Sequence, residues 1–146
     1  MTKLGALFVA GAILAATPAV AQTVGTCSRS GGSANQPQAV WILFDLGSAQ
    51  VRADDKYKIA DAASTAKARQ VSSLCVVGHT DKLGDKVLNV RLARARAQAV
   101  AAELVQASYP ANDIVIAADP EAFGNLSLGV SDAQERDRRV TIVFSR

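Results

Sequence analysis

The residues best suited to chemistry in this sequence lie in one stretch. It opens with Gly-His-Thr-Asp at 78–81, and further on Leu92, Arg96, Val100 and Leu104 follow each other at four-residue intervals. In an α-helix that interval places the four side chains on one side, so a guanidinium stands within an apolar stripe. A guanidinium that is desolvated without an acceptor costs several kcal/mol. Arg96 therefore needs an acceptor in the folded protein.

Two kinds of carboxylate could accept from Arg96. One belongs to the chain itself, such as Asp81 or Asp45, and would form a structural salt bridge. The other is brought by a ligand, because a fixed guanidinium beside an acceptor-only carboxylate suits a molecule with an ammonium and a carboxylate on one carbon. Asp81 and Asp45 also have a local explanation, since Asp is frequent in turns and before helices. The residues alone leave these possibilities open.

Short apolar strands and two amphipathic helices would position these residues. Strands are predicted at 39–44, 74–77, 114–117 and 140–144, and helices at about 53–69 and from 85 or 86 to 107. Asp85 suits the cap of the second helix. The order predicts an α/β (α+β) sandwich, a small mixed sheet packed against two main helices, with a long loop at 119–132. If the first two strands are parallel, Asp45 and Asp81 follow them at the same sheet edge, where ligands tend to bind.

The first 21 residues have the features of a secretory signal peptide. A lysine at position 3 precedes an uncharged apolar run at 4–16, and Ala-Val-Ala at 19–21 supplies the small-x-small cleavage pattern. The run is shorter than the roughly 20 residues that cross a bilayer. We therefore expect a periplasmic protein with no transmembrane segment in the mature chain, and an association with the outer membrane stays open. Residues 22–38 are predicted as a flexible N-terminal segment and 39–146 as one domain.

Export would place the two cysteines in an oxidising compartment. Cys27 and Cys75 allow one intramolecular disulfide, which would tie the N-terminal segment to the domain. Two alternatives stay open. One is a buried thiol at Cys75 with Cys27 unpaired, and the other is lipidation of Cys27, against which the threonine at 26 and the upstream cleavage site argue.

The composition and the residue inventory argue against several classes of protein. Hydrophobic residues make up 49% of the chain and charged residues 20%, which argues against disorder. A net charge of +3 and 5% aromatic residues do not suggest a nucleic-acid binder. His79 is the single histidine, and no dense set of metal ligands accompanies it. We therefore predict neither an enzyme nor a metal site, and no cofactor.

The longer pattern resembles a known family. After Gly-His-Thr-Asp-x-x-Gly at 78–84, the motif positions are Asn89, Leu92, Arg96, Ala97 and Val100, with Arg138-Arg139-Val140 near the end and Phe-Asp-x-Gly-Ser-Ala at 44–49. Over about 40–144 the sequence is similar to the OmpA-like peptidoglycan-binding domain. The resemblance implies a βαβαββ fold. It also implies non-catalytic binding of peptidoglycan, the cell wall, through the meso-diaminopimelate of stem peptides.

The same resemblance implies roles for individual residues. Asp81 would contact the ammonium group of the ligand, and Arg96 its carboxylate. Supporting polar positions match Asp45 and Asn89, and a further basic contact matches one of Arg138 and Arg139. The alternative is an exported interaction or scaffold domain that keeps the fold but binds another envelope protein.

Overall fold

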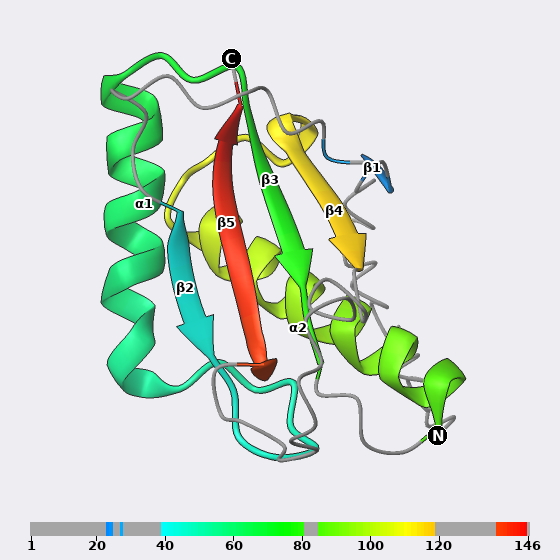
Figure 1. The fold of residues 1–146 in the computed structure, drawn as a ribbon. Coiled ribbons are helices and arrows are strands. Elements are labelled where there is room, and N and C mark those ends of the chain that lie inside the picture. Colours follow the sequence, from blue (N-terminus) through cyan, green and yellow to red (C-terminus); the bar gives the residue numbers. More distant parts are fainter. Residues whose placement is uncertain (1–22, 25–26, 28–38, 81–84, 119–136, 146) are drawn as a thin grey trace, which may run out of the picture.

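The computed structural model describes residues 23–24, 27, 39–80, 85–118 and 137–145, which form two layers (Figure 1). One layer is a five-stranded sheet, and the other holds α1 (Lys56–Ala68) and α2 (Lys86–Gln106), which pack on one face of the sheet. The strands are β1 (Thr23–Val24), β2 (Val40–Leu43), β3 (Ser73–Gly78), β4 (Ile114–Ala118) and β5 (Arg139–Ser145), with short 3-10 helices at Ala53–Asp55 and Ala111–Asp113. The predicted α/β sandwich and its four strands and two helices are confirmed. The predicted signal peptide, Asp81 and the predicted loop 119–132 lie outside the described residues.

The sheet has the strand order β1-β4-β3-β5-β2. β5 is antiparallel to both β2 and β3, so β2 and β3 run in the same direction and end at the same edge. Two hydrogen bonds close this edge. Phe44 N donates to Arg138 O (2.8 Å), and His79 N donates to Arg139 O (2.8 Å). The expectation that both strands end together is therefore confirmed.

The core forms between the sheet and the two helices because alternate strand residues face the helix layer. Buried apolar side chains include Ile42, Val76, Ile116, Ile142 and Phe144 from the sheet, Ile59, Ala62, Ala63 and Ala66 from α1, and Val100, Ala101 and Leu104 from α2. α2 lies very close to β3 at Gly78. A Cβ atom on Gly78 would stand 1.9 Å from the carbonyl oxygen of Ala93. This close approach sets the depth of α2, and hence of Arg96 one turn further along.

Polar side chains interact near the start of each helix, but only α2 has a side-chain cap. The Oδ1 atom of Asp85 accepts from Leu88 N (2.9 Å), which confirms the predicted cap of α2. At the start of α1, Lys58 Nζ lies 2.6 Å from Oδ1 of the buried Asp55. This hydrogen bond raises the pKa of Lys58 above its ordinary value of 10.5.

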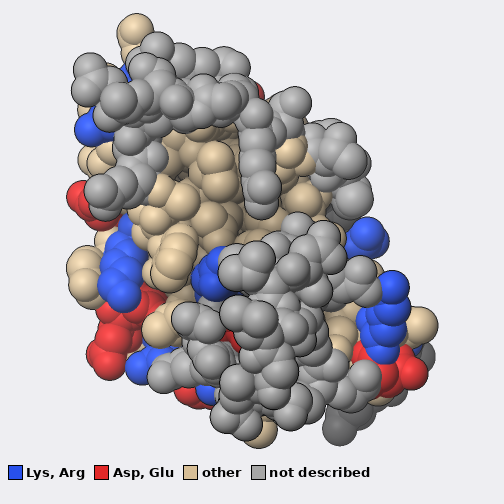
Figure 2. Space-filling model, viewed as in Figure 1, with Lys and Arg blue, Asp and Glu red and all other residues tan. Residues whose placement is uncertain are grey.

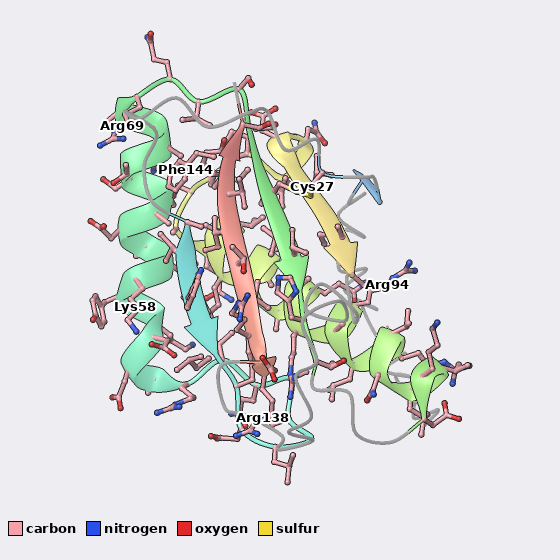
Figure 3. All side chains as sticks on the ribbon, in the orientation of Figure 1. Cys27, Lys58, Arg69, Arg94, Arg138 and Phe144 are labelled. Carbon is pink, nitrogen blue, oxygen red and sulfur yellow. A yellow bond between two sulfur atoms is a disulfide. The ribbon has the colours of Figure 1, made fainter. Side chains whose placement is uncertain are left out.

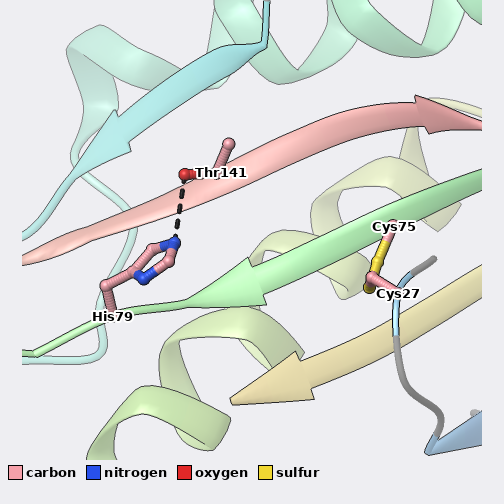
Figure 4. The surroundings of a disulfide bond; sticks show 4 residues. All are labelled: Cys27, Cys75, His79 and Thr141. Carbon is pink, nitrogen blue, oxygen red and sulfur yellow. Dashed lines mark hydrogen bonds between the residues drawn. A yellow bond between two sulfur atoms is a disulfide. The ribbon is translucent and has the colours of Figure 1, made fainter. Parts of the chain in front are cut away.

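A disulfide joins Cys27 to Cys75, residues 48 apart in sequence, as predicted. In β3, Cys75 lies between the core residues Leu74 and Val76, and neighbouring residues of a strand point to opposite faces of the sheet. The disulfide therefore lies on the sheet face turned away from the helices (Figure 4). Next to it, the two residues of β1 pair with β4 in parallel. This strand lies within the segment predicted to be flexible and was not expected from the sequence. Between the grey parts, the exposed surface of this sheet face is mostly uncharged (Figure 2).

Candidate functional site

Arg96 is the largest fully buried side chain among the described residues, with 0% of its surface exposed. Its guanidinium donates three hydrogen bonds to main-chain carbonyls, and each nitrogen has a different acceptor. Nε donates to Ser48 O (2.8 Å), Nη2 to Asp45 O (3.1 Å) and Nη1 to His79 O (3.1 Å). The guanidinium carbon also lies 5.4 Å from the ring centre of Phe44. Arg96 thus joins the chain after β2 to the chain after β3.

The acceptors on the β2 side belong to one tight turn, residues 45–48. Ser48 N donates to Asp45 O (3.1 Å), and Gly47 at the third position has φ +67°. A turn with positive φ at this position favours glycine, because other residues are strained there. Both terminal carbonyls of the turn accept from Arg96, on the edge of the guanidinium formed by Nε and Nη2. Arg96 therefore fixes the shape of this turn.

The β3 side of the site ends at the motif 78–81. The main-chain oxygen of His79 accepts from Arg96, but its imidazole lies on the opposite sheet face, where Nε2 is 3.2 Å from the Oγ1 atom of Thr141 (Figure 4). Thr80 is 5% exposed, and within the described part of the chain its hydroxyl has no hydrogen-bond partner. The described part of this edge therefore ends in a buried hydroxyl with no partner among the described residues, directly before Asp81 in sequence.

Arg138, directly before β5, and Arg139, its first residue, have side chains with different contacts. Arg138 is half-buried at the lower end of the sheet, and its Nε donates to the carbonyl of Phe44 (3.4 Å) (Figure 3). Arg139 alternates with the core residue Val140, and its guanidinium carbon stacks 4.5 Å from the ring centre of Trp41 on the other sheet face. The side chain of Arg138 thus bonds the residue directly before Asp45, one of the acceptors of Arg96.

The remaining predicted site residues are placed only in part. The side chain of Asp45 is exposed, while its main-chain oxygen binds Arg96. Asn89 is half-buried in the first turns of α2, where its N–H donates to Asp85 O (2.9 Å). The structure thus brings Asp45, Arg96 and Arg138 to one edge. Asp81 lies outside the described residues, two positions beyond a direct contact of Arg96.

The described residues contain no cluster of three or more His, Cys, Asp or Glu side chains that could hold a metal ion. Among the same residues, neither helix is both long and apolar enough to span a membrane.

Comparison with known sequences identifies the family. The model of the OmpA family matches residues 43–141, most of the chain. The chain belongs to the OmpA family. The sequence matches none of the curated proteins with which it was compared.

Among solved structures, this OmpA family member is similar to domains from several bacteria. The OmpA-like domain of FopA1 from Francisella tularensis has a TM-score of 0.63 at 23% identity, covering 71% of this chain and 69% of the other. The peptidoglycan-associated lipoprotein from Burkholderia pseudomallei has a TM-score of 0.62 at 22% identity (72% and 89% covered). The cell wall anchor of the T6SS from Pseudomonas aeruginosa has a TM-score of 0.55 at 26% identity (71% and 76% covered). These matches establish the OmpA-like fold.

The three main-chain carbonyls that accept from Arg96 were not predicted for this OmpA family member. Only carboxylates were expected as its acceptors. No residue type identifies a carbonyl acceptor, since every residue has one. The usable signal was Gly47 in the 44–49 motif, because a glycine after Asp45 indicates a tight turn whose carbonyls point in fixed directions.

Proposed function

We propose that this domain binds peptidoglycan without catalysis, through the diaminopimelate of stem peptides, in the periplasm after removal of residues 1–21. The observation that carries the proposal is the buried guanidinium of Arg96 at the edge where β2 and β3 end. Its hydrogen-bonded partner His79 is separated from Asp81 by one residue. Membership of the OmpA family supports the proposal, as do neighbours named for peptidoglycan association and cell wall anchoring.

Each end of the ligand group has a proposed contact. Asp81 takes the ammonium, and Arg96 takes the carboxylate at Nη1, the nitrogen that faces the β3 side. An ionised carboxylate is a stronger acceptor than a carbonyl, so the ligand competes with the carbonyl of His79 for this donor. Thr80 follows His79 in sequence, and its buried hydroxyl is a proposed further polar contact. Arg138 is the proposed additional basic contact, whereas Arg139 stacks on Trp41 on the other sheet face.

The disulfide bears on how the domain could be held in the envelope. One of its fold neighbours is named a lipoprotein. In this chain the sulfur of Cys27 is bonded to the sulfur of Cys75. A sulfur atom in a disulfide cannot also form the thioether of a lipid anchor. We therefore propose that Cys27 serves as a structural crosslink and not as a lipidation site.

Retention on purified sacculi tests the proposal. The wild type should sediment with sacculi that contain diaminopimelate, and Asp81→Asn and Arg96→Lys should lose most of this retention. Lysine keeps the charge of Arg96 but lacks the planar fork that reaches several acceptors. The matched control is Arg94→Lys, which changes an exposed arginine of the same helix (Figure 3). Circular dichroism of each variant checks that it is folded.

Competition with soluble peptides tests the ligand itself. A lysine residue has the side chain of diaminopimelate without the terminal carboxylate. A stem tripeptide that ends in diaminopimelate should therefore release the protein from sacculi, and one that ends in lysine should not. Equal release by both peptides, or equal retention of all variants, would contradict the proposed site. No retention of the wild type would favour a protein partner.

A further inference from the structure

Leu46 stands out among the exposed apolar side chains. Five large apolar residues are exposed in the described part of the chain, and Leu46 is the most exposed of them, at 74%. A single exposed leucine is ordinary on a protein surface. What distinguishes Leu46 is its position: it lies between Asp45 and Ser48, whose carbonyls both accept from the guanidinium of Arg96.

The backbone that carries Leu46 is held at several points. Ser48 N bonds Asp45 O, Gly47 takes the positive φ that the turn needs, and Gln50 N donates to Ser48 Oγ (3.0 Å). Arg96, itself fixed in the core, bonds both ends of the turn. An apolar side chain on a preordered backbone loses less conformational freedom on binding than one on a mobile loop. The turn therefore presents Leu46 as a ready contact at the edge of the site.

The proposed ligand offers a matching group. Diaminopimelate carries its charged ends on an alkyl chain of three methylene groups, so a molecule held by one end at Arg96 extends an apolar chain away from it. We propose that Leu46 packs against this alkyl chain and so helps the site select a long side chain. This inference rests on the proposed function and adds to it a residue that selects for ligand length. Trp41, also exposed, stacks on Arg139 on the other sheet face and does not belong to this contact.

Leu88 provides a matched control of the same residue type. It is 60% exposed and lies in the first turn of α2. It precedes Arg96 by eight residues, about 12 Å along the helix axis at 1.5 Å per residue. If exposed leucines contribute only nonspecific hydrophobic binding, Leu46→Ala and Leu88→Ala should weaken the affinity equally.

Calorimetric titration with the soluble diaminopimelate tripeptide tests the inference. We expect Leu46→Ala to raise the dissociation constant about three- to tenfold, the factor for losing a partly buried leucine contact. Leu88→Ala should change it less than about twofold, and Leu46→Met should restore most of the affinity because methionine keeps the apolar length. Wild-type affinity in Leu46→Ala, or equal losses in both alanine variants, would overturn the inference while the proposed function stands. Absence of binding by the wild type would overturn both.

Discussion

The bonds of Arg96 to the chain give a prediction about stability that does not depend on any ligand. Replacing Arg96 with methionine keeps much of the side-chain volume but removes three donors from the carbonyls of Asp45, Ser48 and His79. Each bond from a charged donor contributes roughly 1.5 to 3 kcal/mol. Removing the charge also ends the cost of burying it, which is several kcal/mol. We expect a net loss of about 3 kcal/mol in the free energy of unfolding.

Urea denaturation followed by circular dichroism measures this loss. With a slope near 1.5 kcal/mol/M, a loss of about 3 kcal/mol moves the midpoint down by about 2 M. Arg94→Met is the control, because it removes an exposed arginine two residues away on the same helix. Arg96→Ala should cost more than Arg96→Met, since it adds a cavity to the lost bonds.

A clear result would refute this reasoning. If Arg96→Met unfolded at the same urea concentration as the wild type, the three carbonyl bonds would contribute nothing net to folding. The free-energy cost of burying the guanidinium of Arg96 would then equal the free energy that its hydrogen bonds contribute. The turn 45–48 would also lose its proposed support, and the proposal for Leu46 would lose the rigid backbone on which it depends.

Two further predictions concern packing and ionisation. Gly78→Ala should destabilise the domain by about 3 kcal/mol, because the added Cβ would meet the backbone of Ala93. Gly47→Ala should cost only about 1 kcal/mol, because its Cβ would have no atom within 4 Å and only the positive φ would be strained. Thermal melts compare the two variants. Burial, with a smaller effect from Asp113, raises the pKa of Tyr109 above its ordinary value of 10.0. Because the folded protein holds this proton more tightly, the stability it contributes is complete below pH 10 and falls as pH rises through the folded pKa. Tyr109→Phe should flatten the alkaline end of the unfolding profile measured in urea, and an unchanged profile would contradict the assignment.

Much of the fold could be predicted because periodicity and caps are local properties. The four-residue interval placed Arg96 beside Val100 and Leu104 on the buried side of α2, and Asp85 capped that helix. β1 could not be found in this way, since two residues show no periodicity. It forms three residues before Cys27, whose crosslink partner Cys75 lies 48 residues further along the chain, and it pairs with β4, which is also remote in sequence.

The need of Arg96 for acceptors was predictable from residue type, but the acceptors themselves were not. The sequence indicated that Arg96 needs an acceptor, yet the acceptors are carbonyls that come together only when β2 and β3 end at one edge. The different destinations of Arg138 and Arg139 also depend on tertiary structure. Arg139 is the first residue of β5, so the face on which its side chain lies depends on the register of β5 with β2, whereas Arg138 precedes the strand.

The disulfide gives the chain a covalent path that differs from its sequence. A tensile force applied ahead of Cys27 passes through the sulfur bridge into β3, bypassing the intervening chain that includes β2 and α1. β3 is hydrogen-bonded on both sides, to β4 and β5, so it resists being pulled out one bond at a time. Its last residue, Gly78, is followed directly by His79, which binds Arg96. Under tension, the strand that leads to the proposed wall contact would therefore also be the strand that takes up the pull.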